Sequence, residues 1–224
     1  LVRSRGLGDV YKRQRIDREI KLGVSLGQTN AEIAKRIVGL RAGDIGSEAL
    51  TISKRDAMSI TRSSVIAISN ESAYQTYQAN DDVIKGVEHL ATLDSRTCPT
   101  CAPRDGCAWD FDGNQFAGNK IPFMRPPIHL NCRCFLSPVT KSFGDLGLDI
   151  AELPAGTRAS QYGQVSENMT FSKFIDRQGA EFAERVLGKG RYELYKKNNL
   201  TLNDLLNPRT FTPLSLADLK QKYN

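Results

Sequence analysis

The amino-acid sequence predicts an α+β fold, with helical N- and C-terminal parts around a central β-hairpin that carries a Cys/His knuckle. Helical periodicity covers residues 15–40 and 52–78 and returns after residue 170. A strand-like segment, VIKGVEHLATL, leads into a block in which all five cysteines fall between residues 98 and 134. The chain of 224 residues is 40% hydrophobic, which is enough to bury a core.

The N-terminal helical region is predicted from a repeating apolar face. Apolar side chains recur one helical turn apart at Ile33, Ala34, Ile37 and Val38. Thr29 or Asn30 is placed to cap this helix, and residues 52–78 carry a narrow stripe of mostly small residues that permits close helix packing. The segment AEIAKRI is similar to the first helix of a helix-turn-helix. No compact turn and basic recognition helix follow it, so we do not expect it to read DNA.

After the cysteine block, the pattern predicts a loop and then a second helical region. Residues 141–169 have a loop-like composition. Phe182 and Val186 then lie one helical turn apart, and Gly188 and Gly190 are placed to end that helix. The segment LTLNDLL predicts a short apolar turn or helix before Pro208.

The first fourteen residues are set apart from this organisation. They carry half of the formal net charge of +6, and they resemble adaptor-derived translations at the ends of metagenomic reading frames. We therefore treat residues 1–14 as non-native, which would mean that the true N-terminus is missing. The remaining chain is divided into a helical region (15–82), the β-hairpin and knuckle (83–140), a loop or linker (141–169) and a helical C-terminal region (170–224).

Neither a membrane segment nor an export signal is expected. The sequence has no run of roughly 18 apolar residues, and its N-terminus lacks an apolar signal-peptide core. An odd number of cysteines without an export signal argues against a disulfide framework, and their crowding argues for metal binding.

The cysteines form two clusters with the spacing of a metal knuckle. The first is Cys98-Pro-Thr-Cys101, and the second is His129-Leu-Asn-Cys132-Arg-Cys134. A two-residue spacer lets both thiolates face one ion, and a pair from the second cluster can complete a tetrahedral site. Thiolate and imidazole ligands at these spacings favour Zn²⁺. Five candidates compete for four positions, so one residue of the second cluster is expected outside the coordination sphere, and the spacing does not decide which.

A closed structural site is favoured over a catalytic one, because catalysis needs an open coordination position and a general base. His89 is followed by Leu90 and Ala91, which departs from the His-x-Glu of zinc deaminases. Phosphate-binding loops, nucleophile elbows and dinucleotide fingerprints are also absent from the sequence. We expect no enzyme activity, no catalytic residue and no small-molecule substrate. Cys107 has no partner at metal-ligand spacing and is expected to be a small, partly buried thiol.

The run LDSRTCPTCAPRDG, followed by PPIHLNCRCFLSPV, resembles the signature of the phage Mu F-like family of head morphogenesis and minor capsid proteins. The matching residues are Asp94, Cys98, Cys101, Asp105, Gly106, Pro127, His129, Asn131, Cys132, Arg133 and Cys134. The segments MSITRSSVIAISNESAYQ and VLGKGRYELYKKNNLTLNDLL resemble the family's helix ahead of the knuckle and its C-terminal trailer. This chain has Arg62-Ser63-Ser64 where the family commonly has Arg-Thr-Glu, which puts in doubt any buried ion pair there.

For the knuckle, the resemblance implies that Cys98, Cys101, His129, Cys132 and Cys134 form the metal cluster. Asp94 and Arg133 bracket this cluster, where a hydrogen bond or ion pair could orient the ligands, with simple surface exposure as the alternative. Gly106 is expected to mark a turn that requires a positive φ angle.

For function, the resemblance implies a minor head protein at the portal vertex with a part in DNA packaging or ejection. Its partners would be the portal protein and other head proteins, and it would be located in the virion and procapsid interior, and in the host cytoplasm during assembly. Lys189, Arg191, Lys196 and Lys197 could contact phage DNA non-specifically. Nearby glutamates dilute this basic stretch, so a solvated helix face is the alternative.

Two other functions compete with this one. A zinc-stabilised nucleic-acid-binding module would have a basic, aromatic-rich knuckle, whereas the loop between the clusters is acidic and apolar. The chain could also be the remnant of a larger Mu F-toxin fusion enzyme. Few residues follow the C-terminal trailer, so a catalytic domain would have to lie upstream.

Overall fold

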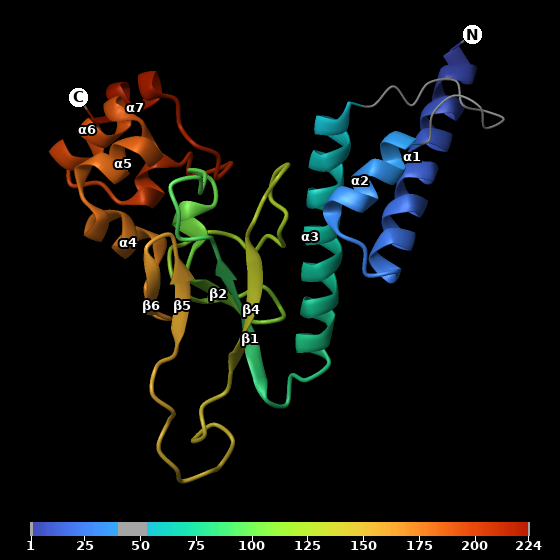
Figure 1. Ribbon diagram of the computed structural model, residues 1–224. Helices are drawn as coiled ribbons and strands as arrows, with labels where there is room; N and C mark the ends of the chain where they lie inside the picture. Colours follow the sequence, from blue (N-terminus) through green and yellow to red (C-terminus); the bar gives the residue numbers. More distant parts are fainter. Residues whose placement is uncertain (1, 40–52, 224) are drawn as a thin grey trace. The chain divides into compact units, whose positions relative to one another are not determined.

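The computed structural model describes residues 2–39 and 53–223, and the predicted helix ends at residues 40 and 52 lie outside this part (Figure 1). The chain forms two compact units. The first comprises residues 1–71 and 126–132, and the second comprises residues 72–125 and 133–224. Helices and two small antiparallel sheets together confirm the α+β class. No helix in the described ranges is both long and apolar enough to span a bilayer.

The first unit is helical, with α1 (Val2–Ser25), α2 (Asn30–Gly39) and most of α3 (Lys54–Gln78). Its core contains the apolar face predicted from the sequence together with side chains from α1 and α3: Ile20, Ile33, Ala34, Ile37 and Ala57. Thr29 caps α2, because its hydroxyl accepts from the Glu32 amide at 3.3 Å while the Glu32 carboxylate accepts from the Thr29 amide at 2.7 Å. A buried Glu19 accepts from Arg36 at 2.7 Å, which ties α1 to α2.

The second unit is built on a four-stranded antiparallel sheet of order β3-β2-β1-β4. The strands are β1 (Ile84–Leu90), β2 (Cys107–Trp109), β3 (Gln115–Ala117) and β4 (Phe135–Thr140), with a 3-10 turn, η1 (Ala102–Arg104), between β1 and β2. In the centre of the sheet, His89 pairs with Cys107 on β2 and with Leu136 on β4. The loop that carries the first cysteine cluster leaves the central strand β1, and the loop that carries the second enters the edge strand β4, which is paired with β1.

Part of the segment expected to be a loop or linker over residues 141–169 forms a second hairpin, β5 (Thr157–Ser160) and β6 (Gly163–Ser166). Both strands are short, and most of their side chains are exposed or half-buried. They therefore lack the apolar alternation by which a strand is recognised in a sequence. The hairpin joins the rest of the unit through a bridge between Ser160 and Leu93.

The C-terminal region is helical, as predicted, with α4 (Phe171–Gln178), α5 (Ala180–Leu187), α6 (Lys189–Lys197), the 3-10 turn η2 (Leu202–Leu205) and α7 (Leu216–Tyr223). Its core includes Leu93 from the loop after β1 and Ala102 from η1, together with Phe171, Phe174 and Phe182. Gly188 has a φ of 82° and ends α5, as expected. Gly190 lies inside α6 and ends no helix, because the chain starts a new helix immediately after Gly188.

Candidate metal centre

The first ligand pair lies in the loop between β1 and η1. The amide of Cys101 donates to the Cys98 carbonyl at 3.1 Å, and the amide of Ala102 donates to the same carbonyl at 3.0 Å. This turn follows from the two-residue spacer and leads directly into η1. Cys101 is buried, with 2% of its surface exposed, and Cys98 is half-buried.

The second set of ligands lies in the loop that precedes β4. A turn in which the Cys132 amide donates to the His129 carbonyl at 3.1 Å shapes this loop. Asn131, at the centre of the turn, has a φ of 59°, a left-handed conformation that Asn adopts more readily than most residues. Cys132 and Cys134 are buried, whereas His129 is exposed.

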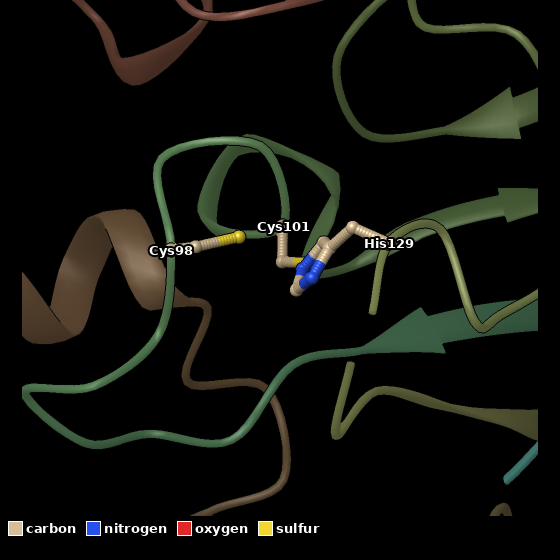
Figure 2. A group of neighbouring side chains, drawn as sticks. All are labelled: Cys98, Cys101 and His129. Carbon is tan, nitrogen blue, oxygen red and sulfur yellow. The ribbon is translucent and has the colours of Figure 1, made fainter. Parts of the chain in front are cut away.

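All five predicted ligands fall into two overlapping groups. The ligand atoms of Cys98, Cys101 and His129 lie within 4.8 Å of one another, and so do those of Cys101, Cys132 and Cys134. Figure 2 shows the first group, with its three side chains converging. Zinc–sulfur bonds of about 2.3 Å in a tetrahedron place two sulfur atoms roughly 3.8 Å apart. Small side-chain movements would therefore bring the ligand atoms to coordination distance, and the donor set fits a thiolate-binding, four-coordinate ion.

Cys107 takes no part in either group. It is fully buried, and its thiol donates to the carbonyls of Pro103 at 3.6 Å and Asn119 at 3.7 Å. Burial raises the pKa of the Cys107 thiol to about 11. The residue is more deeply buried than expected from the sequence and is a protonated structural thiol.

A comparison with protein families identifies the family of this chain. The model of the family described as Phage Mu protein F like protein matches residues 14–137, which is more than half of the chain. The protein belongs to the phage Mu F-like family. Membership makes it a phage head-related protein that is virion-associated and interacts with other head proteins. No curated protein and no solved structure matches the chain.

In this Mu F-like chain, Asp94 and Arg133 are partners of each other. The Arg133 guanidinium donates to both carboxylate oxygens of Asp94, at 2.6 and 2.8 Å. This bidentate pair holds the pKa of Asp94 below its usual range. Arg133 stands between Cys132 and Cys134 in sequence, so the ion pair fixes the backbone beside two candidate ligands to the loop that leads to Cys98. The ion pair is therefore present beside the candidate ligands, and its role in orienting them stays a prediction.

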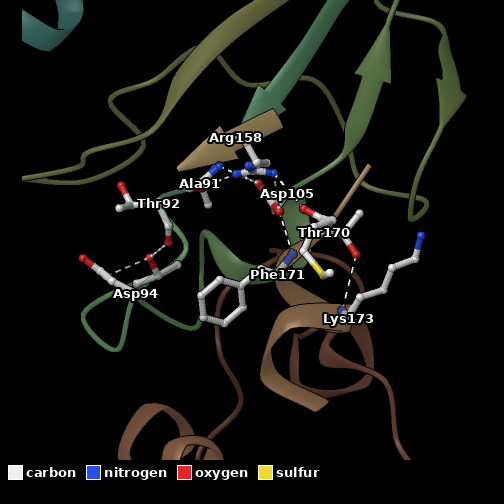
Figure 3. A network of polar contacts seen from close by, with 10 residues as sticks. Ala91, Thr92, Asp94, Asp105, Arg158, Thr170, Phe171 and Lys173 are labelled. Atoms are coloured by element: carbon white, nitrogen blue, oxygen red, sulfur yellow. Dashed lines mark hydrogen bonds and ion pairs between the residues drawn. The ribbon is translucent and has the colours of Figure 1, made fainter. Parts of the chain in front are cut away.

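Asp105, inside the range of the Mu F-like match, is the centre of a buried polar network (Figure 3). Asp105 accepts from the amides of Ala91 at 2.7 Å and Phe171 at 2.6 Å, and from both terminal nitrogens of Arg158 at 3.1 and 3.2 Å. Arg158 also donates to the Ala91 carbonyl at 2.6 Å. Gly106 has a φ of 79°, and a Cβ atom there would lie 2.7 Å from the Thr170 methyl group. Arg158 could not be predicted as part of this network, because its strand lies in a segment with loop-like composition.

Ser63, in the Arg62-Ser63-Ser64 segment of α3, contacts the turn at Asn131. The Ser63 hydroxyl accepts from the Asn131 amide at 2.9 Å, and the Ser59 hydroxyl accepts from the Asn131 side-chain amide at 3.2 Å. Two serines one turn apart on α3 therefore hold the turn that carries His129 and Cys132.

The four basic residues considered for DNA contact all lie on α6, but they differ in availability. Lys189, Lys196 and Lys197 are exposed. Arg191 is half-buried and donates to the Leu214 carbonyl at 3.0 Å, which fixes the segment before α7. The three lysines are therefore free to meet a phosphate backbone, whereas Arg191 already serves the packing of the C-terminal region.

Proposed function

We propose that this chain is a minor head protein that acts in head morphogenesis at the portal vertex, with a part in DNA packaging or ejection. The observation that carries the proposal is the Mu F-like match over residues 14–137, which includes both cysteine clusters. The portal protein is the proposed direct partner, and the procapsid interior is the proposed location. The protein acts by binding rather than by catalysis.

The proposed role of the Cys/His cluster is to hold one structural Zn²⁺ ion. Four ligands come from the five residues Cys98, Cys101, His129, Cys132 and Cys134. The three buried cysteines among these would keep water away from the ion. The loops that carry these residues have little regular structure, so a metal cross-link would contribute much of their order. A structural zinc site in a small module contributes on the order of 10 kcal/mol of folding free energy.

The head role is tested in the phage or prophage that encodes the chain. Deleting the gene should lower the number of infectious particles, and expression of the wild-type chain in trans should restore it. The chain and the portal protein, co-expressed, should sediment together at the position of the portal ring. A deletion that leaves head number and titre unchanged, together with separate sedimentation of the two proteins, would refute the proposed role.

The metal role is tested with two cysteine variants matched in chemistry. Cys98→Ser should abolish stoichiometric zinc binding and lower the melting temperature, because it removes a ligand. Cys107→Ser should keep both, because Cys107 lies outside the cluster and a serine hydroxyl can donate to the same carbonyls. Metal content by mass spectrometry and thermal melts provide the readouts. Equal metal content and melting temperature in Cys98→Ser and the wild type would contradict a metal centre at these residues.

Non-specific DNA contact is a second proposed activity, supported by the exposed Lys189, Lys196 and Lys197 on α6. Binding through phosphates weakens steeply with salt, and each lost contact reduces the salt dependence by about one unit of slope. Replacing Lys196 and Lys197 by Gln should therefore lower both affinity and slope on duplex DNA. Identical titrations for this variant and the wild type would remove α6 as the contact surface.

A further inference from the structure

Residues 144–156, which we call the arm, lie between β4 and β5 and are exposed throughout. In Figure 1 the arm is the long loop that extends away from the sheet after β4 and returns to it at β5. Its large apolar side chains are Leu146, Leu148, Ile150 and Leu153, which are 38%, 49%, 59% and 78% exposed. Single exposed leucines are ordinary, but four large apolar side chains within eight residues form a continuous surface of the kind that binds a partner.

The base of the arm is fixed by hydrogen bonds to Phe143. The Leu148 amide donates to the Phe143 carbonyl at 2.8 Å, and the Glu152 carboxylate accepts from the Phe143 amide at 2.7 Å. Beyond this turn, the amides of residues 149–153 donate to no acceptor in the described part of the chain. The arm is therefore held in place while its leucines and part of its backbone stay accessible. A segment that is ordered in advance loses less entropy when it binds.

The charge of the arm indicates the chemistry of its partner. Asp145, Asp149 and Glu152 are interspersed with the apolar side chains. No Lys or Arg lies within the arm, so these three carboxylates give it a charge of −3, opposite in sign to the chain as a whole. Phosphate groups and anionic membrane surfaces repel such a segment. An apolar pocket rimmed by Lys and Arg side chains complements both its charges and its leucines, so a protein surface fits the arm better than a nucleic acid does.

We propose that the arm is the segment through which this protein docks on the portal protein, with its leucines in an apolar pocket rimmed by Lys and Arg side chains. This inference rests on the proposed function, which names the portal protein as the direct partner, and adds the contacting segment and the chemistry of the pocket. Figure 1 shows the arm and α6 at opposite ends of the second unit. Docking through the arm therefore leaves the exposed lysines of α6 accessible to DNA.

The test measures binding of the full-length chain to the purified portal ring, by sedimentation and by fluorescence anisotropy. The arm variant combines Leu148→Ser with Leu153→Ser. The matched control combines Leu22→Ser with Leu26→Ser, at positions in and just after α1 that are 42% and 60% exposed. Because all four leucines are exposed, both variants should keep the melting temperature of the wild type.

The arm variant should lose most of its affinity for the portal ring. Burying an exposed leucine side chain strengthens binding roughly tenfold or more, so the arm variant should bind about 100-fold more weakly than the wild type. The control variant should bind as the wild type does. Asp149→Lys should lower the affinity more at low salt than at high salt, because salt screens its repulsion from a basic rim. Asp112→Lys, at an exposed acid outside the arm, should change the salt dependence less.

Three results would overturn the inference. An arm variant that binds the portal ring as tightly as the wild type would exclude the arm as the docking segment and leave the proposed portal role standing. A wild-type chain that does not bind the ring would refute that role, and docking through the arm with it. Dimers of the wild-type chain alone in sedimentation, absent from the arm variant, would show that the arm binds a second copy instead.

Discussion

The most demanding prediction concerns Asp105, whose side chain is completely buried. Asp105→Ala removes the acceptor for two backbone amides, Ala91 and Phe171, and the only carboxylate that Arg158 contacts among the described residues. The Arg158 side chain is 13% exposed, so water cannot replace the lost partner fully. This one carboxylate therefore connects the loop after β1, the strand β5 and the start of α4.

The expected loss of stability follows from the polar groups that lose their partner in Asp105→Ala. Each buried amide without an acceptor costs about 1–3 kcal/mol. Removing one partner of a buried ion pair costs about 3–5 kcal/mol in total, since an uncompensated charge remains. The two estimates overlap because they describe the same site, so we expect Asp105→Ala to lower the free energy of unfolding by about 3–5 kcal/mol. This is a large share of the roughly 5–15 kcal/mol that stabilises a typical domain.

The assay is urea unfolding followed by circular dichroism, with Asp112→Ala as the control. Asp112 is exposed, so its replacement should change the free energy of unfolding by less than about 0.5 kcal/mol. Arg158→Met should cost less in the Asp105→Ala background than in the wild type, because the charge that it removes is then unpaired. Equal costs in both backgrounds, or a loss below about 1 kcal/mol for Asp105→Ala, would show that the network does not hold the fold as described.

Two further predictions concern single side chains. Burial raises the pKa of Glu88, so its folded form binds a proton more tightly than the unfolded form, and its contribution to stability is full below pH about 4 and lost as pH rises through the raised pKa. Glu88→Gln should therefore match the wild type near pH 4 and be more stable at pH 7.5 in urea unfolding; a constant difference across this range would contradict the shift. Asn131→Ala should lower the free energy of unfolding by about 1–2 kcal/mol, through lost hydrogen bonding to Ser59 and strain at a positive φ. Asn131→Gly removes only the hydrogen bond and should cost less, so equal losses would exclude strain.

Helices and cysteine clusters could be predicted from the sequence because their signals are local. Apolar side chains one turn apart predict α2, and a two-residue spacer predicts a shared ligand position for Cys98 and Cys101 whatever surrounds them. The hairpin β5–β6 could not be predicted, since its polar strands are ordered by the pairing with Leu93 and by Arg158 rather than by their own pattern. The expectation that Gly190 ends a helix is wrong for a related reason: the positive φ angle typical of a terminating glycine occurs at Gly188, whereas Gly190 lies inside α6.

The residues that support the site could not be predicted from the sequence either. Arginine is almost never fully buried unless it is paired, so a sequence alone favours a surface position for it. The burial of Arg104, which is 1% exposed, could therefore not be predicted. The same applies to Ser59 and Ser63, whose hydroxyl groups matter because α3 lies beside the turn at Asn131. Candidate ligands can be recognised from residue type and spacing. The residues that hold them in place depend on tertiary contacts between segments far apart in the chain.

The limits of the Mu F-like match do not coincide with the limits of a folded unit. The match ends at residue 137, but Asp105 accepts from the Phe171 amide at the start of α4, and Arg158 reaches back to the Ala91 carbonyl. Gly106 is packed so closely on Thr170 that a side chain there would clash. The Asp105-Gly106 pair, which lies inside the match, therefore holds the hairpin and helices beyond it. Because the unit extends from residue 133 to the C-terminal helices, the lysines of α6 belong to the same folded body as the Cys98–Cys101 loop.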